Sequence, residues 1–307
     1  MGWRAKSIQF KFLSMLPGGT ALYNYTQEKI TKSTLASPTR VDQKVKVGLE
    51  FWNWVERNNC SGKLIEGRLL DLGAGWHPTI PMLWYAFGNQ SQTLVDVSPN
   101  MDARKVIDTI NIFHAIASDR AFPARSAVKR LPEVMPAQTD LASEVLSPLG
   151  IEYIAPYRDF LQHRPGEYDM VICTQVLQHI PKPVQLAIFK ELFAAMKPGG
   201  LFHATVHFVG QFRSPNLDTG QYEHLRFSPS TWEKWINSSL MGFNRLKGPD
   251  YRETLEQAGF RIREFKLTLP SPDDMRELKR TRIHPSFSRY TEEELATRGV
   301  FFVAEKP

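Results

Sequence analysis

The feature that most constrains this fold is a glycine turn between two apolar runs, each of which leads into an aspartate. The first run carries Asp71 and breaks at Gly73 and Gly75, and the second ends at Asp96. Asp96 lies 21 positions after Gly75. This spacing is typical of a strand, a tight turn, a helix and a second, parallel strand. We therefore predict a carboxylate at the tip of each of two neighbouring strands.

This turn has the chemistry of a cofactor site. Glycine lacks a Cβ atom, so the backbone at Gly73 and Gly75 can bend sharply and approach a ligand closely. A carboxylate after the second strand can accept hydrogen bonds from both hydroxyls of a ribose. A dinucleotide site would have a third glycine where this chain has Pro78, and an apolar residue where it has Asp71. The turn therefore favours S-adenosyl-L-methionine (SAM) over NAD, with an ordinary strand-to-helix turn as the alternative.

The two glycines and two aspartates resemble the first two motifs of the class I SAM-dependent methyltransferases. The resemblance implies that Gly73 and Gly75 lie against the amino-acid part of SAM. It also implies that Asp71 supports the methionine end and that Asp96 holds the ribose. SAM is therefore the expected cofactor.

Seven runs after residue 62 have the length and composition of strands, and helical stretches separate most of them. They fall at residues 67–72, 92–97, 151–155, 169–174, 200–207, 260–269 and 300–305. The central runs are apolar on both faces, as a parallel sheet covered by helices requires. Together with the resemblance, this order implies an α/β, Rossmann-like, doubly wound sheet. It would have seven mostly parallel strands with an antiparallel finish, N-terminal helices and a substrate cap.

The same order predicts how the chain is divided. Residues 1–62 are expected to form an N-terminal helical segment, because Ser61 and Gly62 break the pattern before the first strand. Residues 63–307 would form the SAM-binding domain. Two stretches, near 101–150 and 209–249, exceed what a minimal sheet needs. Insertions at the carboxyl end of a parallel sheet lie where ligands bind, so both are expected to form the substrate cap.

The segment after the fourth predicted strand resembles the fourth-strand motif of small-molecule methyltransferases. The resemblance implies that Thr174 and Gln175 line the cofactor pocket. Those relatives commonly have Glu-His where this chain has Gln178-His179, and we interpret His179 as a structural residue of the loop. In the same family the adenine is flanked after the third strand. Asp159 would suit contact with its amino group there, and a surface-turn acid is the alternative.

His207 is the candidate catalytic residue. Transfer to a hydroxyl of high pKa benefits from a general base facing the methyl group, and histidine has a suitable pKa. His207 ends the fifth predicted strand, and alternation places His203 on the same side. The alternative is one buried histidine and one loop histidine. No metal site is expected, because a third ligand at useful spacing does not accompany the pair.

A segment dense in aromatic and polar residues follows His207. Tyr222 and Trp232 could stack on a sugar or other ring, and Arg245 could pair with a carboxylate or phosphate. Packing within the cap is the alternative for each. This segment is similar to a subgroup of bacterial methyltransferases of glycan and specialised-metabolite pathways. The resemblance implies a small-molecule acceptor.

Composition bounds the partners and the compartment. The net charge of +6 is weak evidence for acidic partners, because the basic residues are scattered. Two cysteines are too few for a disulfide framework, so we expect a reducing compartment and a cytoplasmic location. The N-terminal residues lack the apolar length of a membrane span. No sequence feature indicates an oligomeric state.

The sequence therefore predicts a SAM-dependent methyltransferase that acts on a small molecule, most readily by O-methylation of a sugar or specialised metabolite. Three alternatives remain open. An NAD-dependent enzyme would need the missing third glycine and would bind NADH rather than SAM. An RNA methyltransferase would present a continuous basic face and bind RNA in a salt-sensitive manner. A non-catalytic SAM-binding protein would bind SAM and tolerate loss of His207.

Overall fold

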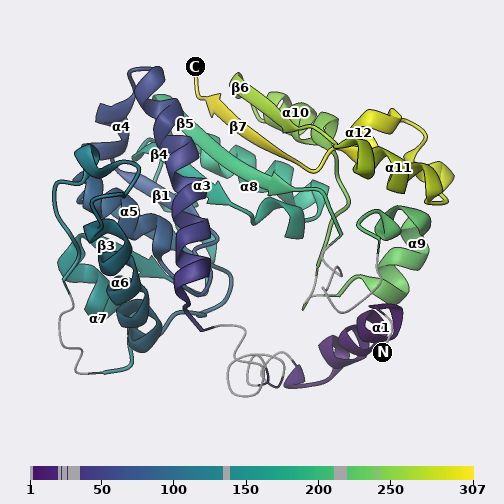
Figure 1. Cartoon of the computed structure of the whole chain (residues 1–307), viewed down its shortest axis with the longest axis horizontal. Helices are drawn as coiled ribbons and strands as arrows, with labels where there is room; N and C mark the ends of the chain where they lie inside the picture. Colours follow the sequence, from purple (N-terminus) through teal and green to yellow (C-terminus); the bar gives the residue numbers. More distant parts are fainter. Residues whose placement is uncertain are drawn as a thin grey trace. The chain divides into compact units, whose positions relative to one another are not determined.

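The computed structural model describes residues 3–19, 22, 26, 35–133, 139–210, 220–238, 240 and 242–307 (Figure 1). The chain divides into two compact units. Unit 1 comprises residues 1–33, 174–190 and 204–304, and unit 2 comprises residues 34–173, 191–203 and 305–307. No helix within the described ranges is both long enough and apolar enough to cross a lipid bilayer.

A seven-stranded sheet has the order β3-β2-β1-β4-β5-β7-β6. Its strands are β1 (Leu69–Leu72), β2 (Gln92–Val95), β3 (Ile151–Ile154), β4 (Tyr168–Thr174), β5 (Met196–His207), β6 (Arg261–Thr268) and β7 (Gly299–Glu305). Chain order runs outward from β1 to β3 and then returns beside β1 at β4. The strand order therefore reverses at β1, and ligands of open α/β sheets bind at such a reversal, beyond the carboxyl ends of the strands.

Strand directions follow from the hydrogen-bond register. β1 pairs in parallel with both β2 and β4, and β2 pairs in parallel with β3. Along β5 and β7 the register runs in opposite senses. Phe208 N donates to Arg298 O in unit 1, and Lys306 N donates to Gly200 O in unit 2. The expected mostly parallel sheet with an antiparallel finish is thus confirmed.

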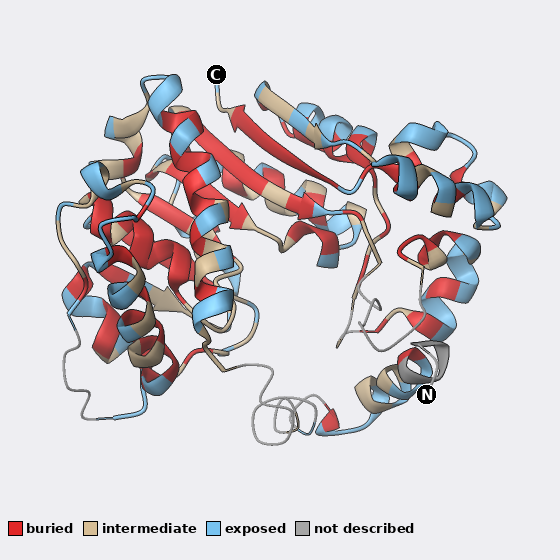
Figure 2. Cartoon of the chain, viewed as in Figure 1, coloured by how far each residue is buried: buried red, intermediate tan, exposed pale blue. Residues whose placement is uncertain are grey.

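Unit 2 contains helices α3 (Pro38–Arg57), α4 (Ser61–Ile65), α5 (Thr79–Phe87), α6 (Ala103–Ser118) and α7 (Ala142–Leu146). Its short turns are η2 (Arg125–Ala127), η3 (Ser147–Leu149) and η4 (Asp159–His163). Helices α3, α5 and α6 contact one another. The apolar residues of these helices are buried (Figure 2). The helices cover one face of the parallel strands, and a parallel sheet is normally covered by helices on each of its faces.

Unit 1 carries α1 (Trp3–Met15), α10 (Gly248–Gln257), α11 (Pro272–Arg280), α12 (Glu292–Ala296) and the short elements η5 (Leu177–His179), η6 (Glu223–Arg226), α9 (Pro229–Thr231), η7 (Trp232–Ile236) and η8 (Pro285–Phe287). Helix α8 (Lys182–Ala195) begins in this unit. Capping boxes start α11 at Ser271 and α12 at Thr291. Strand β7 is buried almost throughout, whereas much of α11 is exposed (Figure 2).

All seven predicted strands are present, and their bounds differ by a few residues. The largest difference is at β5, which starts at Met196, whereas the predicted run starts at residue 200. The proposed division at residue 62 and the two cap insertions stay predictions. Parts of them, including 134–138, 211–219 and several positions before residue 35, lie outside the described residues.

Candidate active site

The glycine turn after β1 has the strained backbone that its sequence predicts. Gly73 and Gly75 have φ angles of 83° and 69°, in the left-handed region that residues with a Cβ atom rarely adopt. Gly73 N donates to Val95 O at 2.8 Å, and Gly75 N donates to Asp96 Oδ2 at 2.8 Å. A Cβ atom on Gly75 would meet only Gly73 O, at 4.0 Å. The turn therefore leaves space beside its backbone for a ligand.

Asp96 directly follows β2 and is held by the main chain. Its Oδ1 accepts from Ser98 N at 2.9 Å, and its backbone oxygen accepts from Tyr157 N. The other carboxylate oxygen, Oδ2, accepts from Gly75 N. Both oxygens are therefore fixed, and each has a lone pair left to accept a further hydrogen bond. The carboxylate is therefore oriented in advance to accept hydroxyl hydrogen bonds.

Asp71 lies on β1 near a buried amine that the sequence reading missed. Burial raises the pKa of Asp71 to about 7, and the Lys44 ammonium opposes this while Asp96 adds to it. Burial lowers the pKa of Lys44, and Asp71 and Cys173 oppose that change. Lys44 belongs to α3, outside every recognised motif, so no spacing rule could have found it. A cationic group placed beside Asp71 would favour its carboxylate form.

These residues fit SAM. The open turn at Gly75 accommodates a ligand, the fixed Asp96 carboxylate suits a diol, and the buried Asp71 carboxyl suits an amino group. Asp159 lies at the start of η4, and its side chain is exposed. Its contact with the adenine stays a prediction.

Unit 1 contains a polar pair of its own, after β4 and at the end of β5. The side-chain amide nitrogen of Gln175 and the ring Nε2 of His207 lie 2.6 Å apart. Gln175 follows Thr174, the half-buried last residue of β4, and has a φ of 59°. Its backbone N donates to Thr205 O at 2.8 Å. Non-glycine residues rarely adopt the left-handed region of φ, and those that do cluster at functional sites, where the surrounding structure imposes the strained backbone.

The two histidines of β5 differ in their surroundings. His203 is buried, and its ring stacks on Phe51 at 4.0 Å between centroids. His207, at the end of the strand, is exposed. In the neighbouring loop His179 Nδ1 lies 2.5 Å from Gly242 O, which agrees with the structural role predicted for it. His207 is thus the histidine of this strand that solvent or a substrate can reach.

The three predicted substrate residues lie in the interior of unit 1. Tyr222 is fully buried and donates its hydroxyl to Ala296 O. Trp232 donates its indole N–H to Phe243 O at 3.1 Å. Arg245 is 7% exposed, and its guanidinium lies 4.7 Å from the Trp232 ring centroid. Stacking on a substrate ring would require Tyr222 and Trp232 to leave these packing positions.

Comparisons with known proteins agree with this geometry. The family model described as a methyltransferase domain matches residues 49–264. A ubiquinone biosynthesis O-methyltransferase of Burkholderia pseudomallei is 25% identical over 179 residues, which cover 51% of this chain and 72% of that protein. The protein of the same name from Xanthomonas campestris pv. campestris is 27% identical over 118 residues, 34% of this chain and 48% of that protein.

Solved structures are more distant in sequence. Magnesium protoporphyrin IX methyltransferase from Synechocystis PCC 6803 is 12% identical, with a TM-score of 0.45 over 99% of this chain and 100% of that one. A SAM-dependent methyltransferase from Mesorhizobium loti is 14% identical, with a TM-score of 0.41 over 79% and 92%. The family match spans most of the chain and includes the glycine turn and both aspartates. The chain therefore belongs to the methyltransferase domain family, and it is a methyltransferase that uses SAM.

Proposed function

We propose that this enzyme transfers the methyl group of SAM to a hydroxyl oxygen of a small molecule, a sugar or specialised metabolite, and that His207 takes the proton. The observation that carries the proposal is the 2.6 Å contact between His207 and Gln175. It provides an exposed imidazole whose ring is oriented by a neighbouring amide. General bases in enzymes are commonly oriented in this way by a third group.

In this proposal the cofactor is held by the glycine turn and three acids. Gly73 and Gly75 lie along the amino-acid part, Asp71 pairs with the amino group and Asp96 binds the ribose. Asp159 contacts the adenine, and Thr174 and Gln175 line the pocket. The sulfonium of SAM supplies an already activated methyl group, so the protein has to align the acceptor and remove its proton.

The Gln175 amide selects which ring nitrogen acts. In the structure the amide nitrogen faces Nε2, and an amide can turn either end toward a partner because its oxygen and nitrogen have the same shape. The proposal requires the orientation in which the oxygen faces His207. With the oxygen facing His207, Nε2–H donates to Gln175 and Nδ1 is left to accept the proton. The acceptor hydroxyl would then give its proton to Nδ1 as its oxygen bonds to the methyl carbon, and the bond from that carbon to sulfur breaks.

Two further observations support a small hydroxylic acceptor. The curated relatives are named O-methyltransferases. The basic residues of α11 are also interleaved with acids, and Arg276 pairs with Asp273 on the same helix. Tyr222, Trp232 and Arg245 enter the proposal as the packed interior of the cap that shapes the acceptor site.

The test is methyl transfer from labelled SAM to a panel of sugars and phenols. We expect His207→Ala to lower kcat by about 100-fold or more, which is the usual contribution of a general base. Binding of S-adenosylhomocysteine (SAH) should stay within about twofold, because His207 takes no part in cofactor binding. His114→Ala, at an exposed histidine of α6, is the control. Undiminished turnover by His207→Ala would remove His207 from the mechanism.

A further inference from the structure

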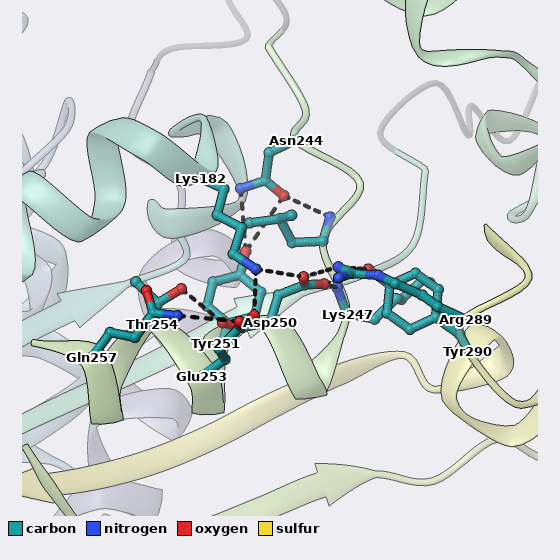
Figure 3. Close-up of polar contacts among 11 residues, drawn as sticks. Lys182, Asn244, Lys247, Asp250, Tyr251, Glu253, Thr254, Gln257, Arg289 and Tyr290 are labelled. Carbon is teal, nitrogen blue, oxygen red and sulfur yellow. Dashed lines mark hydrogen bonds and ion pairs between the residues drawn. The ribbon is translucent and has the colours of Figure 1, made fainter. Parts of the chain in front are cut away.

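A mostly buried segment in unit 1, residues 244–250, contacts both the loop after Gln175 and the residue after His207. Figure 3 shows its residues Asn244, Lys247 and Asp250. We call this segment the bracket. It includes the first turn of α10, and its polar side chains besides Arg245 come from Asn244, Lys247 and Asp250. None of these three residues belongs to a cofactor motif.

One arm of the bracket holds the loop after Gln175. The Asn244 side chain donates to Leu177 O and to Ile180 O, each at 2.7 Å, and its backbone N donates to Gln178 O at 2.8 Å. Gln178 in turn donates from Nε2 to Gln175 O at 2.8 Å. The loop is therefore fixed at four of its carbonyls, one of which belongs to Gln175, the residue with the left-handed backbone.

The other arm holds the chain after His207. Lys247 is fully buried, and its ammonium donates to Leu295 O at 2.9 Å and to Phe208 O at 3.4 Å. Phe208 directly follows His207, and its ring stacks on Tyr251 of α10 with centroids 5.5 Å apart. Lys247 Nζ also lies 5.7 Å from the centroid of the Phe208 ring, so the bracket contacts both the carbonyl and the ring of the residue beside the proposed base.

Asp250 ties the two arms together. It is 1% exposed, and its Oδ2 accepts from Lys247 N at 2.9 Å and from the Tyr290 hydroxyl at 2.5 Å. Its Oδ1 pairs with Arg289 and with Lys182, the latter at 3.2 Å. Lys182 is the first residue of α8, at the far end of the loop that Asn244 holds. Figure 3 shows these side chains converging on one carboxylate.

We propose that the bracket is a positioning device for methyl transfer, in which Asn244 and Lys247 set the geometry of the Gln175–His207 pair. A buried lysine is expensive to desolvate, and apolar packing would fill the same space at lower cost. Its ammonium instead donates to main-chain carbonyls, one of which adjoins His207. The inference rests on the proposed function, since it assigns a role to residues that act through that pair.

The experiment reads the pair directly, without an acceptor substrate. The full chain is labelled with 15N-histidine, and the ring signals of His207 are assigned by their loss in His207→Gln. Lys247→Met keeps the length of the side chain but removes its donors, and Asn244→Ala removes the other arm. We expect both variants to move the His207 ring 15N shifts to those of Gln175→Ala. Gln257→Ala, an exposed change on α10, should match wild type.

Steady-state kinetics with an acceptor substrate from the panel provide a second, independent measurement. We expect Lys247→Met to lower kcat by about 10- to 100-fold, because a misplacement of about 1 Å has effects of this size. The KM for SAM should stay within about twofold. If Lys247→Met does not fold, Asn244→Ala and the milder Tyr290→Phe, which removes one bond to Asp250, give the same reading.

The outcomes separate this inference from the proposed function. Wild-type ring shifts in folded Lys247→Met and Asn244→Ala would overturn the bracket, even if His207→Ala is inactive. Shifts that move to the Gln175→Ala values, combined with full activity of His207→Ala, would support the bracket and reject His207 as the base.

Discussion

At the scale of single residues, Asp71 gives the site a predictable pH dependence. Burial raises its pKa to about 7, so roughly half of the ligand-free molecules carry a proton there at neutral pH. An amino group of a ligand prefers the carboxylate form. Binding below pH 7 must therefore release the proton, which weakens affinity by up to about tenfold for each pH unit.

We accordingly expect SAH affinity to rise between pH 5.5 and about 7 and then to level off. Asp71→Asn should bind more weakly at pH 7.5 and show a much flatter profile, because no proton is left to release. Calorimetric titrations at several pH values measure both. A wild-type profile as flat as that of the variant would mean that Asp71 does not face the amino group.

Residue-level prediction from sequence succeeds where a backbone rule operates. The left-handed φ angles of Gly73 and Gly75 follow from a tight strand-to-helix turn. The position of Asp96 follows from the number of residues between this turn and the end of the second strand. Lys44 and Lys247 obey no such rule, since each depends on a contact between segments far apart in sequence. Pro249 and Asp250 indicate the start of helix α10, and this is the part of the bracket that a sequence rule can predict.

At the scale of elements, the end of β5 and the start of α10 are coupled through Lys247. Burial lowers its pKa to about 7, with Asp250 opposing. In the unfolded chain this amine holds its proton up to a pH near 10.5. Between about pH 7 and 10.5 the unfolded state therefore binds more protons, so the contribution of Lys247 to stability rises with pH and is lost as pH falls toward 7.

We expect wild type to gain about 2 kcal/mol of unfolding free energy relative to Lys247→Met between pH 7 and pH 9, since each pH unit contributes at most about 1.4 kcal/mol. Urea denaturation of both proteins at the two pH values measures the difference, and other titrating groups cancel in the comparison. Parallel changes in the two proteins would show that Lys247 is protonated in the folded state throughout this range.

At the level of elements, the sequence predicts the strands of the sheet well and the elements around the predicted cap less well. The seven strands could be recognised because apolar runs of the right length alternate with helical stretches. The early start of β5 at Met196 could not, because Gly199 and Gly200 look like a helix stop and pair with the last residues of the chain instead. The π-helical turn η7, around Trp232, is likewise set by packing rather than by local preference.

At the scale of the whole molecule, the fold places its cofactor motifs and its proposed base on different segments of one sheet. The glycine turn, Asp71 and Asp96 belong to unit 2, and Gln175 and His207 belong to unit 1. The topology of the sheet explains why the sequence predicted both sets, since the glycine turn, Asp96 and Gln175 follow strands of this sheet and Asp71 and His207 lie at or near strand ends. The interior positions of Tyr222 and Trp232 depend on cap packing, for which no spacing rule exists.

The most direct test of this account is a calorimetric titration of the full chain with SAH, run beside NADH and repeated on Asp96→Ala and His207→Ala. We predict SAH binding in the micromolar range, about −8 kcal/mol, with no comparable affinity for NADH. Asp96→Ala should weaken SAH binding by about 100-fold or more, whereas His207→Ala should leave it unchanged. Preference for NADH, or undiminished SAH binding by Asp96→Ala, would contradict the assignment of the glycine turn and Asp96 as the SAM site.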